Sequence, residues 1–291
     1  MRADRADVPG WSARDTALRL TSIALLLRPM GPWYTRAPVL GLAALCLVSP
    51  RSLRTSAVWI ALAVLVMLRI ASDWPLADNH IYLLAYWCLA AGLSLRTSDA
   101  ERVLASNARS LIGLAFACAV IWKLVLSPDF VDGRFFRVTL LTDPRFTEAT
   151  QIVGGLSGAQ LESNRRTLEP PPEGAELLEP PAVVEPVRLR AFAYVSTWSV
   201  LALEAAVAIV MLIPTSAFVG AARHAALLTF CVITYAVAPV AGFGWLLLVM
   251  GAAQVASERR WLTSIYVAGF LLVLFYSEVP WTSLVLDWLR G

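Results

Sequence analysis

Lys123 and Glu204 are ionisable residues that lie inside apolar stretches of this 291-residue sequence. Lys123 falls within Arg109–Phe130 and is the only lysine, so the other 23 basic residues are arginines. A lysine in apolar surroundings can lose its proton near neutral pH because desolvation disfavours its charged form, whereas arginine keeps its proton. Lys123 is therefore a candidate general base. The alternative is a lysine whose ammonium group reaches a nearby membrane interface.

Glu204 is the only one of the 21 acidic residues that falls inside a predicted span. It lies roughly 10–18 Å from the end of its helix, and Lys123 lies roughly 6 Å from the corresponding end of its own, at about 1.5 Å per residue. A lysine side chain covers much of that difference, so we expect a Lys123–Glu204 pair. Such a pair is also the main alternative to a catalytic lysine, because an adjacent carboxylate favours the ammonium form and makes the pair a structural bridge.

A second polar group precedes the apolar block that begins at Ile81. Asn79 and His80 stand there beside the aromatic residues Trp74 and Tyr82. One interpretation is a helix cap with aromatic residues in the interfacial belt. The other is a polar rim that hydrogen-bonds a ring-shaped lipid headgroup, with His80 as proton carrier.

Three other features of the sequence are interpreted as structural. His224, next to Arg223, is expected at the membrane interface, and Arg69 is expected to pair with Asp73 one helical turn on. The four cysteines lie in apolar blocks without metal or CxxC spacing, so we interpret them as packing residues. No metal-binding, phosphate-binding or dinucleotide motif stands out, and no basic run interleaved with aromatic residues indicates nucleic acid.

The composition predicts the elements that position these residues. The chain is 58% hydrophobic and 15% charged, whereas soluble domains have about 25% charged residues. Apolar blocks separated by short arginine-bearing links predict a single all-α, polytopic membrane bundle over residues 1–291, with eight or nine transmembrane helices. The first two blocks are short, so they are two tilted spans or one hairpin. The blocks run over residues 17–27, 37–48, 57–71, 81–95, 103–126, 192–213, 222–237, 243–255 and 262–276.

Arginine placement predicts the orientation of the bundle. Arginines concentrate before the first block and in alternate short links, which places the N-terminus in the cytoplasm and the C-terminus outside. Acidic residues at the start and the lack of a small-residue cleavage site argue against a cleaved signal peptide.

The segment 127–190 is predicted to be a long external loop between the fifth and sixth helices. Residues 129–160 can hold short helices, and Phe130, Phe135 and Phe136 are able to dip into the interface. Residues 168–186 are rich in Pro and Glu and are interpreted as an extended strap, with a partner-binding motif as the alternative.

Two stretches of the sequence carry a family resemblance. The stretch ADNHIYLLAYW contains Asn79, His80, Tyr82 and Leu83, and the stretch AVIWKLVLSPDFVDG contains Lys123, Leu124, Asp129, Phe130 and Gly133. Together with Glu204 they resemble the membrane core of the vitamin K-dependent γ-carboxylases and their bacterial relatives, the horizontally transferred transmembrane (HTTM) domain proteins. The resemblance follows the helix order over most of the chain and implies a bacterial inner membrane.

The resemblance implies a function. Lys123 is then the base that deprotonates a reduced naphthoquinone, such as reduced vitamin K or menaquinol, with Asn79 and His80 seating it. Reaction with O₂ gives an epoxide and a strong base, which removes a γ-proton from a glutamate of a secreted or membrane protein before CO₂ adds.

The chain also departs from the carboxylase pattern. It has no second histidine in LLTFCVITYAVAP, and it stops at Gly291 without a large external region. Quinol binding is therefore expected more firmly than glutamate carboxylation. The alternative is a non-catalytic scaffold or lipid- or quinone-binding subunit in which Lys123 and Glu204 form a structural ion pair. A transporter ranks third, because few polar residues line the spans and no inverted repeat is evident.

Overall fold

The computed structural model describes residues 12–28, 31–169, 182–214, 217–237, 240–278 and 288. Within these residues every regular element is a helix, which confirms the predicted all-α class. Nine of the described helices have 12 or more residues, and they coincide with the nine apolar blocks. These are α1 (Ala13–Leu27), α2 (Trp33–Val48), α4 (Ser56–Ser72), α5 (Asn79–Ser94), α6 (Ala100–Ile121), α11 (Val187–Leu212), α12 (Ala217–Val237), α13 (Ala241–Ala252) and α14 (Arg260–Glu278).

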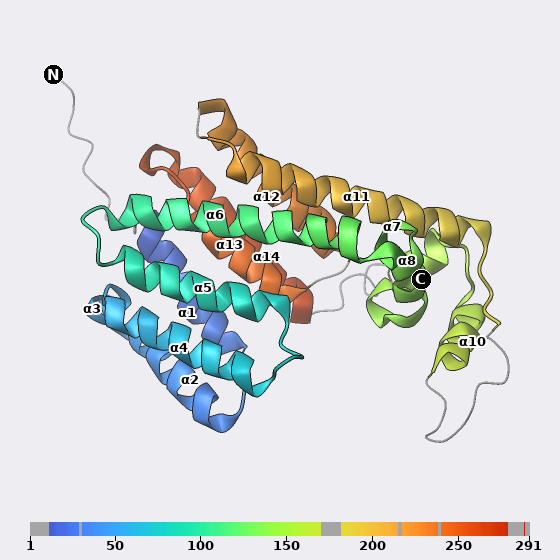
Figure 1. Ribbon diagram of the computed structural model, residues 1–291, viewed down its shortest axis with the longest axis horizontal. Coiled ribbons are helices and arrows are strands. Elements are labelled where there is room, and N and C mark those ends of the chain that lie inside the picture. The colour runs from blue at the N-terminus through green and yellow to red at the C-terminus, as the bar shows by residue number, and fades with distance from the viewer. Residues whose placement is uncertain are drawn as a thin grey trace.

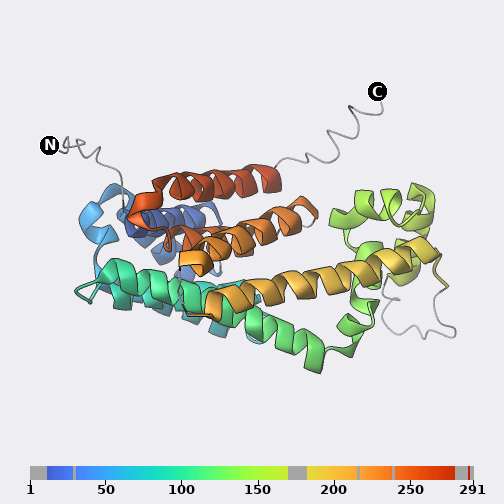
Figure 2. The same cartoon turned by 90° about the horizontal axis from the view of Figure 1, so that it is seen from above.

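The long helices form one bundle. Figures 1 and 2 show α6 and α11 lying side by side, with α11 reaching past the other long helices at one end of the molecule. Helix α4 packs on α5, α13 packs on α14, and α1 packs on both α2 and α13. The two short N-terminal blocks therefore form an antiparallel helical hairpin within the bundle.

Two helical stretches are long and apolar enough to cross a bilayer, Ala100–Leu126 and Val187–Leu212. By length and composition they indicate association with a membrane. Helices α1, α2, α4, α5 and α13 have 12 to 17 residues, fewer than the roughly 20 that a straight span needs. The sequence-based count of eight or nine spans is therefore larger than the number of helices that meet this criterion in the described structure.

Large aromatic side chains fill the core of the bundle, and their polar atoms are bonded inside it. Trp59 and Trp87 are fully buried. The Trp59 indole N–H donates to the Leu53 carbonyl at 2.8 Å, and the Trp87 indole N–H donates to the Thr21 hydroxyl at 2.9 Å. Each bond removes the cost of burying a bare N–H group.

The segment after α6 folds into short helices, as predicted for residues 129–160. They are α7 (Pro128–Val131), α8 (Arg134–Thr142), α9 (Thr147–Ile152) and α10 (Gly158–Leu168). This segment is more than a hydrophilic loop, because it encloses a separate apolar core with the first turns of α11. The buried members of that core are Leu140, Leu141, Phe146, Leu156, Leu161, Leu189 and Ala193.

Most of the Pro- and Glu-rich strap predicted at 168–186 lies outside the described residues, which resume at 182. The described return to α11 is held by two contacts. The buried Asn164 amide accepts from the Val184 N–H and donates to the Val184 carbonyl, both at 2.8 Å. Arg137 forms an ion pair with the neighbouring Glu185.

Candidate functional site

Lys123 and Glu204 are in direct contact, as the sequence predicts. The Lys123 ammonium group forms an ion pair with Oε1 of Glu204, which joins the end of the α6 stretch to the middle of α11. The Lys123 side chain is 22% exposed and the Glu204 side chain is 9% exposed. The pair is therefore largely buried, with the lysine on its outer side.

A change of helix type positions Lys123. Residues Trp122–Leu126 form a π-helix that continues α6, with Ser127 as its C-cap. Pro128 follows, and because proline has no N–H and disfavours helical geometry in the residue before it, the helix ends there. Wider π turns occur frequently at functional sites. The sequence pattern predicted an ordinary helix around Lys123. The Ser–Pro step that ends the helix was the signal in the sequence for a change of structure close to Lys123.

Phe130 of α7 lies beneath the lysine. The Lys123 ammonium nitrogen is 4.9 Å from the centroid of the Phe130 ring, within the range of a cation–π contact. Phe130 is buried and packs against Phe135 and Phe136. Phe130 is therefore not available to dip into an interface, because its ring packs against Lys123 and the neighbouring rings.

The second oxygen of the Glu204 carboxylate is buried and has no hydrogen-bond partner among the described residues. Leaving such an acceptor bare costs about 1–3 kcal/mol, so an unfilled position of this kind calls for an explanation. A ligand hydroxyl that donates to this oxygen would supply the hydrogen bond that the carboxylate lacks. Lys123 and Glu204 together can thus bind a hydroxyl group and exchange its proton.

The surface around Lys123 is apolar. Large hydrophobic side chains of the Lys123 helix and of the facing part of α11 are exposed, namely Ile121, Trp122, Leu124, Val125, Leu126, Tyr194, Val195 and Trp198. A water-soluble protein rarely exposes so many neighbouring apolar groups unless they bind a partner or a membrane. This surface therefore suits the approach of an apolar ligand to Lys123.

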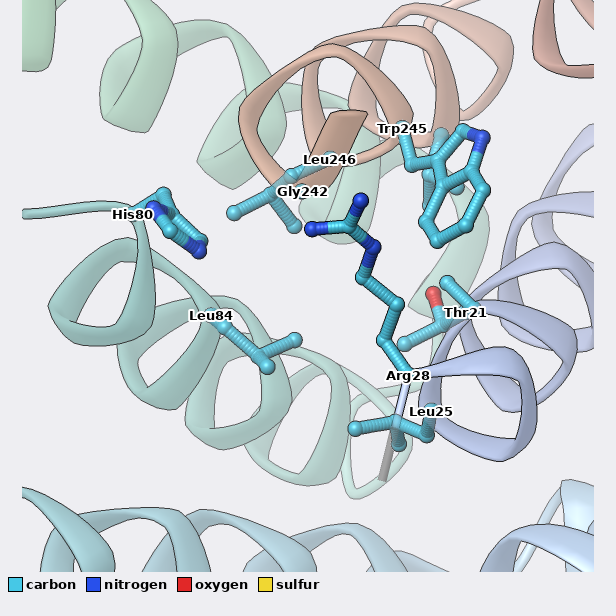
Figure 3. Close-up of a pocket in the computed structure, with 10 residues that line it drawn as sticks. Thr21, Leu25, Arg28, His80, Leu84, Gly242, Trp245 and Leu246 are labelled. Carbon is cyan, nitrogen blue, oxygen red and sulfur yellow. The ribbon is translucent and has the colours of Figure 1, made fainter. Parts of the chain in front are cut away.

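The structure places His80 in a different site from Lys123. His80 lines a pocket of about 50 Å³ between α1, α5 and α13, together with Arg28 and Trp245 (Figure 3). No hydrogen bond, ion pair or ring contact joins His80 to Lys123 within the described structure. The two catalytic residues expected from the sequence are thus not brought into contact.

The other residues expected at this rim are dispersed. Asn79 is exposed in the first turn of α5, and Trp74 is exposed in the link that precedes the helix. Tyr82 packs on a small cluster that includes Val66 and Ile70. The N-cap of α5 is Asp78, which makes no side-chain capping hydrogen bond, so the structure shows neither a capped helix nor a joined polar rim here.

Arg69 pairs with Asp73 as predicted. His224 is not a free interfacial residue, because its Nδ1 lies 2.8 Å from the hydroxyl of Tyr266, a fully buried residue. His224 lies about two turns into α12 and contacts α14. Its place next to Arg223 in the sequence did not indicate that contact. Cys46, Cys88 and Cys231 are buried as expected of packing residues, whereas Cys118 is exposed. The residues that the structure describes contain no cluster of His, Cys, Asp and Glu suited to a metal ion.

Comparisons with models of protein families, with curated proteins and with solved structures find no match to this chain.

Proposed function

We propose that this chain is a polytopic α-helical protein of a bacterial inner membrane, with its N-terminus in the cytoplasm and residues 127–190 outside. Nine helices follow nine apolar blocks, and exposed hydrophobic side chains occur on α4, α6, α11 and α14, which supports lipid contact around the bundle. Helices of 15 to 17 residues, such as α1, α2, α4 and α5, cover about 22–26 Å at 1.5 Å per residue. Local thinning of the bilayer accommodates helices of that length.

Within this protein, Lys123 and Glu204 form the active site of a carboxylase-like, quinol-dependent enzyme. One observation carries the proposal: a largely buried Lys–Glu pair retains an unpartnered carboxylate oxygen beside an exposed apolar surface. A reduced naphthoquinone has the matching chemistry, because it combines an apolar ring and tail with a hydroxyl that can donate to Glu204.

The proposed reaction requires one step from Lys123 and Glu204, the removal of a proton. A base takes the proton from a quinol hydroxyl, and the quinolate then reacts with O₂ to give the quinone epoxide and hydroxide. The proton held by the base converts that hydroxide to water. Lys123 acts as that base when it is neutral, which requires that its proton pass to Glu204 or that the ligand separate the two groups. His80 and Asn79 lie outside this site, and His80 lines a separate pocket between α1, α5 and α13.

The test is epoxide formation by the purified full-length chain reconstituted with menaquinol or reduced vitamin K and O₂. Wild type is expected to form the quinone epoxide, and Lys123→Ala and Glu204→Gln are expected to lose at least a hundredfold in rate, as expected for loss of a general base. Arg102→Gln, at an exposed position at the other end of α6, serves as the control and keeps its activity. Absence of epoxide with wild-type protein and either quinol refutes the proposal.

Carboxylation is a separate part of the proposal. If the epoxide reaction is coupled to a protein substrate, labelled CO₂ appears in a glutamate-containing peptide only when quinol and O₂ are both present. If epoxide forms but no label is incorporated, the protein is a quinol oxygenase that does not carboxylate such a peptide.

The second candidate function is a non-catalytic membrane scaffold or lipid-binding subunit. It is favoured by the direct contact between Lys123 and Glu204, because a carboxylate in contact with an ammonium group stabilises its charge. In that case wild type forms no epoxide, and the variants at Lys123 and Glu204 change stability alone.

A further inference from the structure

A small pocket lies where the end of α1 meets the beginnings of α5 and α13. Its volume is about 50 Å³, and its polar side chains are Thr21, Arg28 and His80. Figure 3 shows Arg28 and His80 extending toward one another from opposite sides of the pocket, with Trp245 beside the guanidinium. Since a cavity needs about 10–15 Å³ of such space to hold one water molecule, the pocket suits a few waters or a group of a few heavy atoms.

The guanidinium of Arg28 is available to a ligand. In the described part of the chain it has no hydrogen-bond acceptor and no carboxylate within ion-pair distance. Its described contact is with the Trp245 ring, whose centroid lies 5.5 Å from the guanidinium carbon. The five N–H donors of arginine remain free in such a contact, because the cation lies over the ring face. Thr21 offers less, because its hydroxyl donates to Ala17 and accepts from Trp87.

A glycine leaves space for His80 on the opposite side of the pocket. A Cβ atom added at Gly242 would lie 2.8 Å from Nε2 of His80, closer than real side chains approach. Glycine at this position therefore leaves room for the imidazole ring at the pocket wall. Among the described residues, Asp78 is the carboxylate close to His80, and it is exposed and bonded to neither His80 nor Arg28.

Two helices also begin at this pocket. His80 is in the first turn of α5 and Gly242 is in the first turn of α13, and neither helix has a side chain that caps its first N–H groups. The N-terminal end of a helix carries a partial positive charge and bare N–H donors. Arg28, the two helix ends and the lack of a lining carboxylate all favour a negative charge in the same small space.

We propose that this pocket binds a small oxyanion, a carboxylate or phosphate group, with the Arg28 guanidinium as its main contact and His80 facing it. The planar guanidinium matches two oxygens of such a group, which a single ammonium cannot do. The oxyanion is either a free ion or the headgroup of a lipid, since Arg28 is exposed at the rim of the bundle. This site is separate from Lys123 and stands whether or not the chain reacts with quinols.

The first test uses inorganic phosphate and acetate as probes of the full-length protein in a neutral detergent, at constant ionic strength. Saturable stabilisation against thermal unfolding is expected for wild type, with chloride as the reference anion. Arg28→Gln is expected to raise the apparent dissociation constant at least tenfold, and Arg28→Lys to recover part of the loss. Arg102→Gln removes an equal charge from an exposed position outside the pocket and is expected to bind as wild type does.

A second test separates the free ion from the lipid headgroup. Phosphatidylglycerol and a diacylglycerol with the same acyl chains are added to the detergent-solubilised protein, and bound lipid is counted by native mass spectrometry. Retention of phosphatidylglycerol that depends on Arg28 assigns the site to a headgroup, whereas binding of phosphate or acetate alone assigns it to a free ion. If Arg28→Gln and Arg102→Gln bind every probe equally well, the proposed site does not exist.

Discussion

At the scale of single residues, the ion pair of Lys123 and Glu204 is expected to dominate the stability of the α6–α11 contact. Removing one partner leaves the other as an uncompensated buried charge, which costs about 3–5 kcal/mol. Lys123→Met should therefore lower the free energy of unfolding by about 3 kcal/mol or more. The double variant Lys123→Met/Glu204→Leu should lie within about 1 kcal/mol of wild type, because apolar packing replaces the pair.

The measurement is chemical unfolding in mixed micelles, analysed as a double-mutant cycle. An exposed pair on α10, Arg166 and Glu162, is the matched control, with side chains 74% and 54% exposed. Coupling between exposed helical partners is about 0.3–0.5 kcal/mol. Equal coupling in the two cycles would contradict the buried, structural part of the Lys123–Glu204 contact.

Gly31 has a backbone conformation that other residues adopt at a cost. Its φ angle is +82°, and an added Cβ would lie 2.3 Å from Cδ of Arg69, whose guanidinium pairs with Asp73. Gly31→Ala is therefore expected to destabilise the α1–α2 hairpin by about 1–2 kcal/mol. Gly41 in the middle of α2 has no atom within 4 Å of its added Cβ, and Gly41→Ala should stabilise the helix by up to about 1 kcal/mol.

Thermal unfolding of the two glycine variants beside wild type measures both effects in one experiment. The signs are expected to be opposite. A Gly31→Ala protein as stable as wild type would show that the turn between α1 and α2 tolerates a different backbone conformation.

At the scale of elements, hydrogen bonds between oppositely charged residues of the same segment stabilise the short helices after α6. The Arg145 side chain donates to the Asp143 carboxylate, and the Arg145 backbone N–H does so as well. These hydrogen bonds hold the pKa of Asp143 below its ordinary value, although partial burial opposes them. A carboxyl whose pKa is lowered by folding stabilises the fold above its unfolded pKa of about 4, and that contribution is lost as the pH falls further.

Arg145→Gln should therefore raise the pKa of Asp143 toward its ordinary value and destabilise α8 and α9 at neutral pH. Below the folded pKa of Asp143, variant and wild type should converge, because the carboxyl is protonated in both. Carbon NMR of the carboxyl gives the pKa, and amide hydrogen exchange of α8 and α9 gives the local stability. A destabilisation that persists unchanged at that low pH would assign the effect of Arg145 to packing instead.

At the scale of the whole molecule, the sequence predicted what depends on local pattern. The nine apolar blocks correspond to nine helices. The contact between Lys123 and Glu204 could be predicted because each is the sole residue of its kind inside an apolar block. Other contacts between separate helices involve residues whose type and position in the sequence did not mark them, so they could not be predicted. The pocket of Arg28 and His80 is one, because α1, α5 and α13 form it from distant parts of the chain. The amide pair that ties Asn164 to Val184 is another.

The number of spans is the property of the whole molecule that most needs a test. If nine helices cross the membrane, residue 76 in the link between α4 and α5 is on the external side of the inner membrane and residue 98 between α5 and α6 is in the cytoplasm. If Ala100–Leu126 and Val187–Leu212 alone cross, the two links lie on the same side. The positions suit a labelling experiment because Leu76 and Ser98 are both exposed.

Leu76→Cys and Ser98→Cys are introduced separately into a Cys118→Ala background, since Cys118 is exposed whereas the other three cysteines are buried. A maleimide small enough to pass the outer membrane but unable to cross the inner membrane is applied to cells before and after lysis. With nine spans in the proposed orientation, the cysteine at 76 reacts in intact cells and the cysteine at 98 reacts only after lysis. Equal reactivity of the two positions contradicts the nine-span topology, because α5 then lies on one side of the membrane. The exchanged pattern keeps α5 as a span but inverts the protein, which would place the Lys123 end of α6 on the cytoplasmic side.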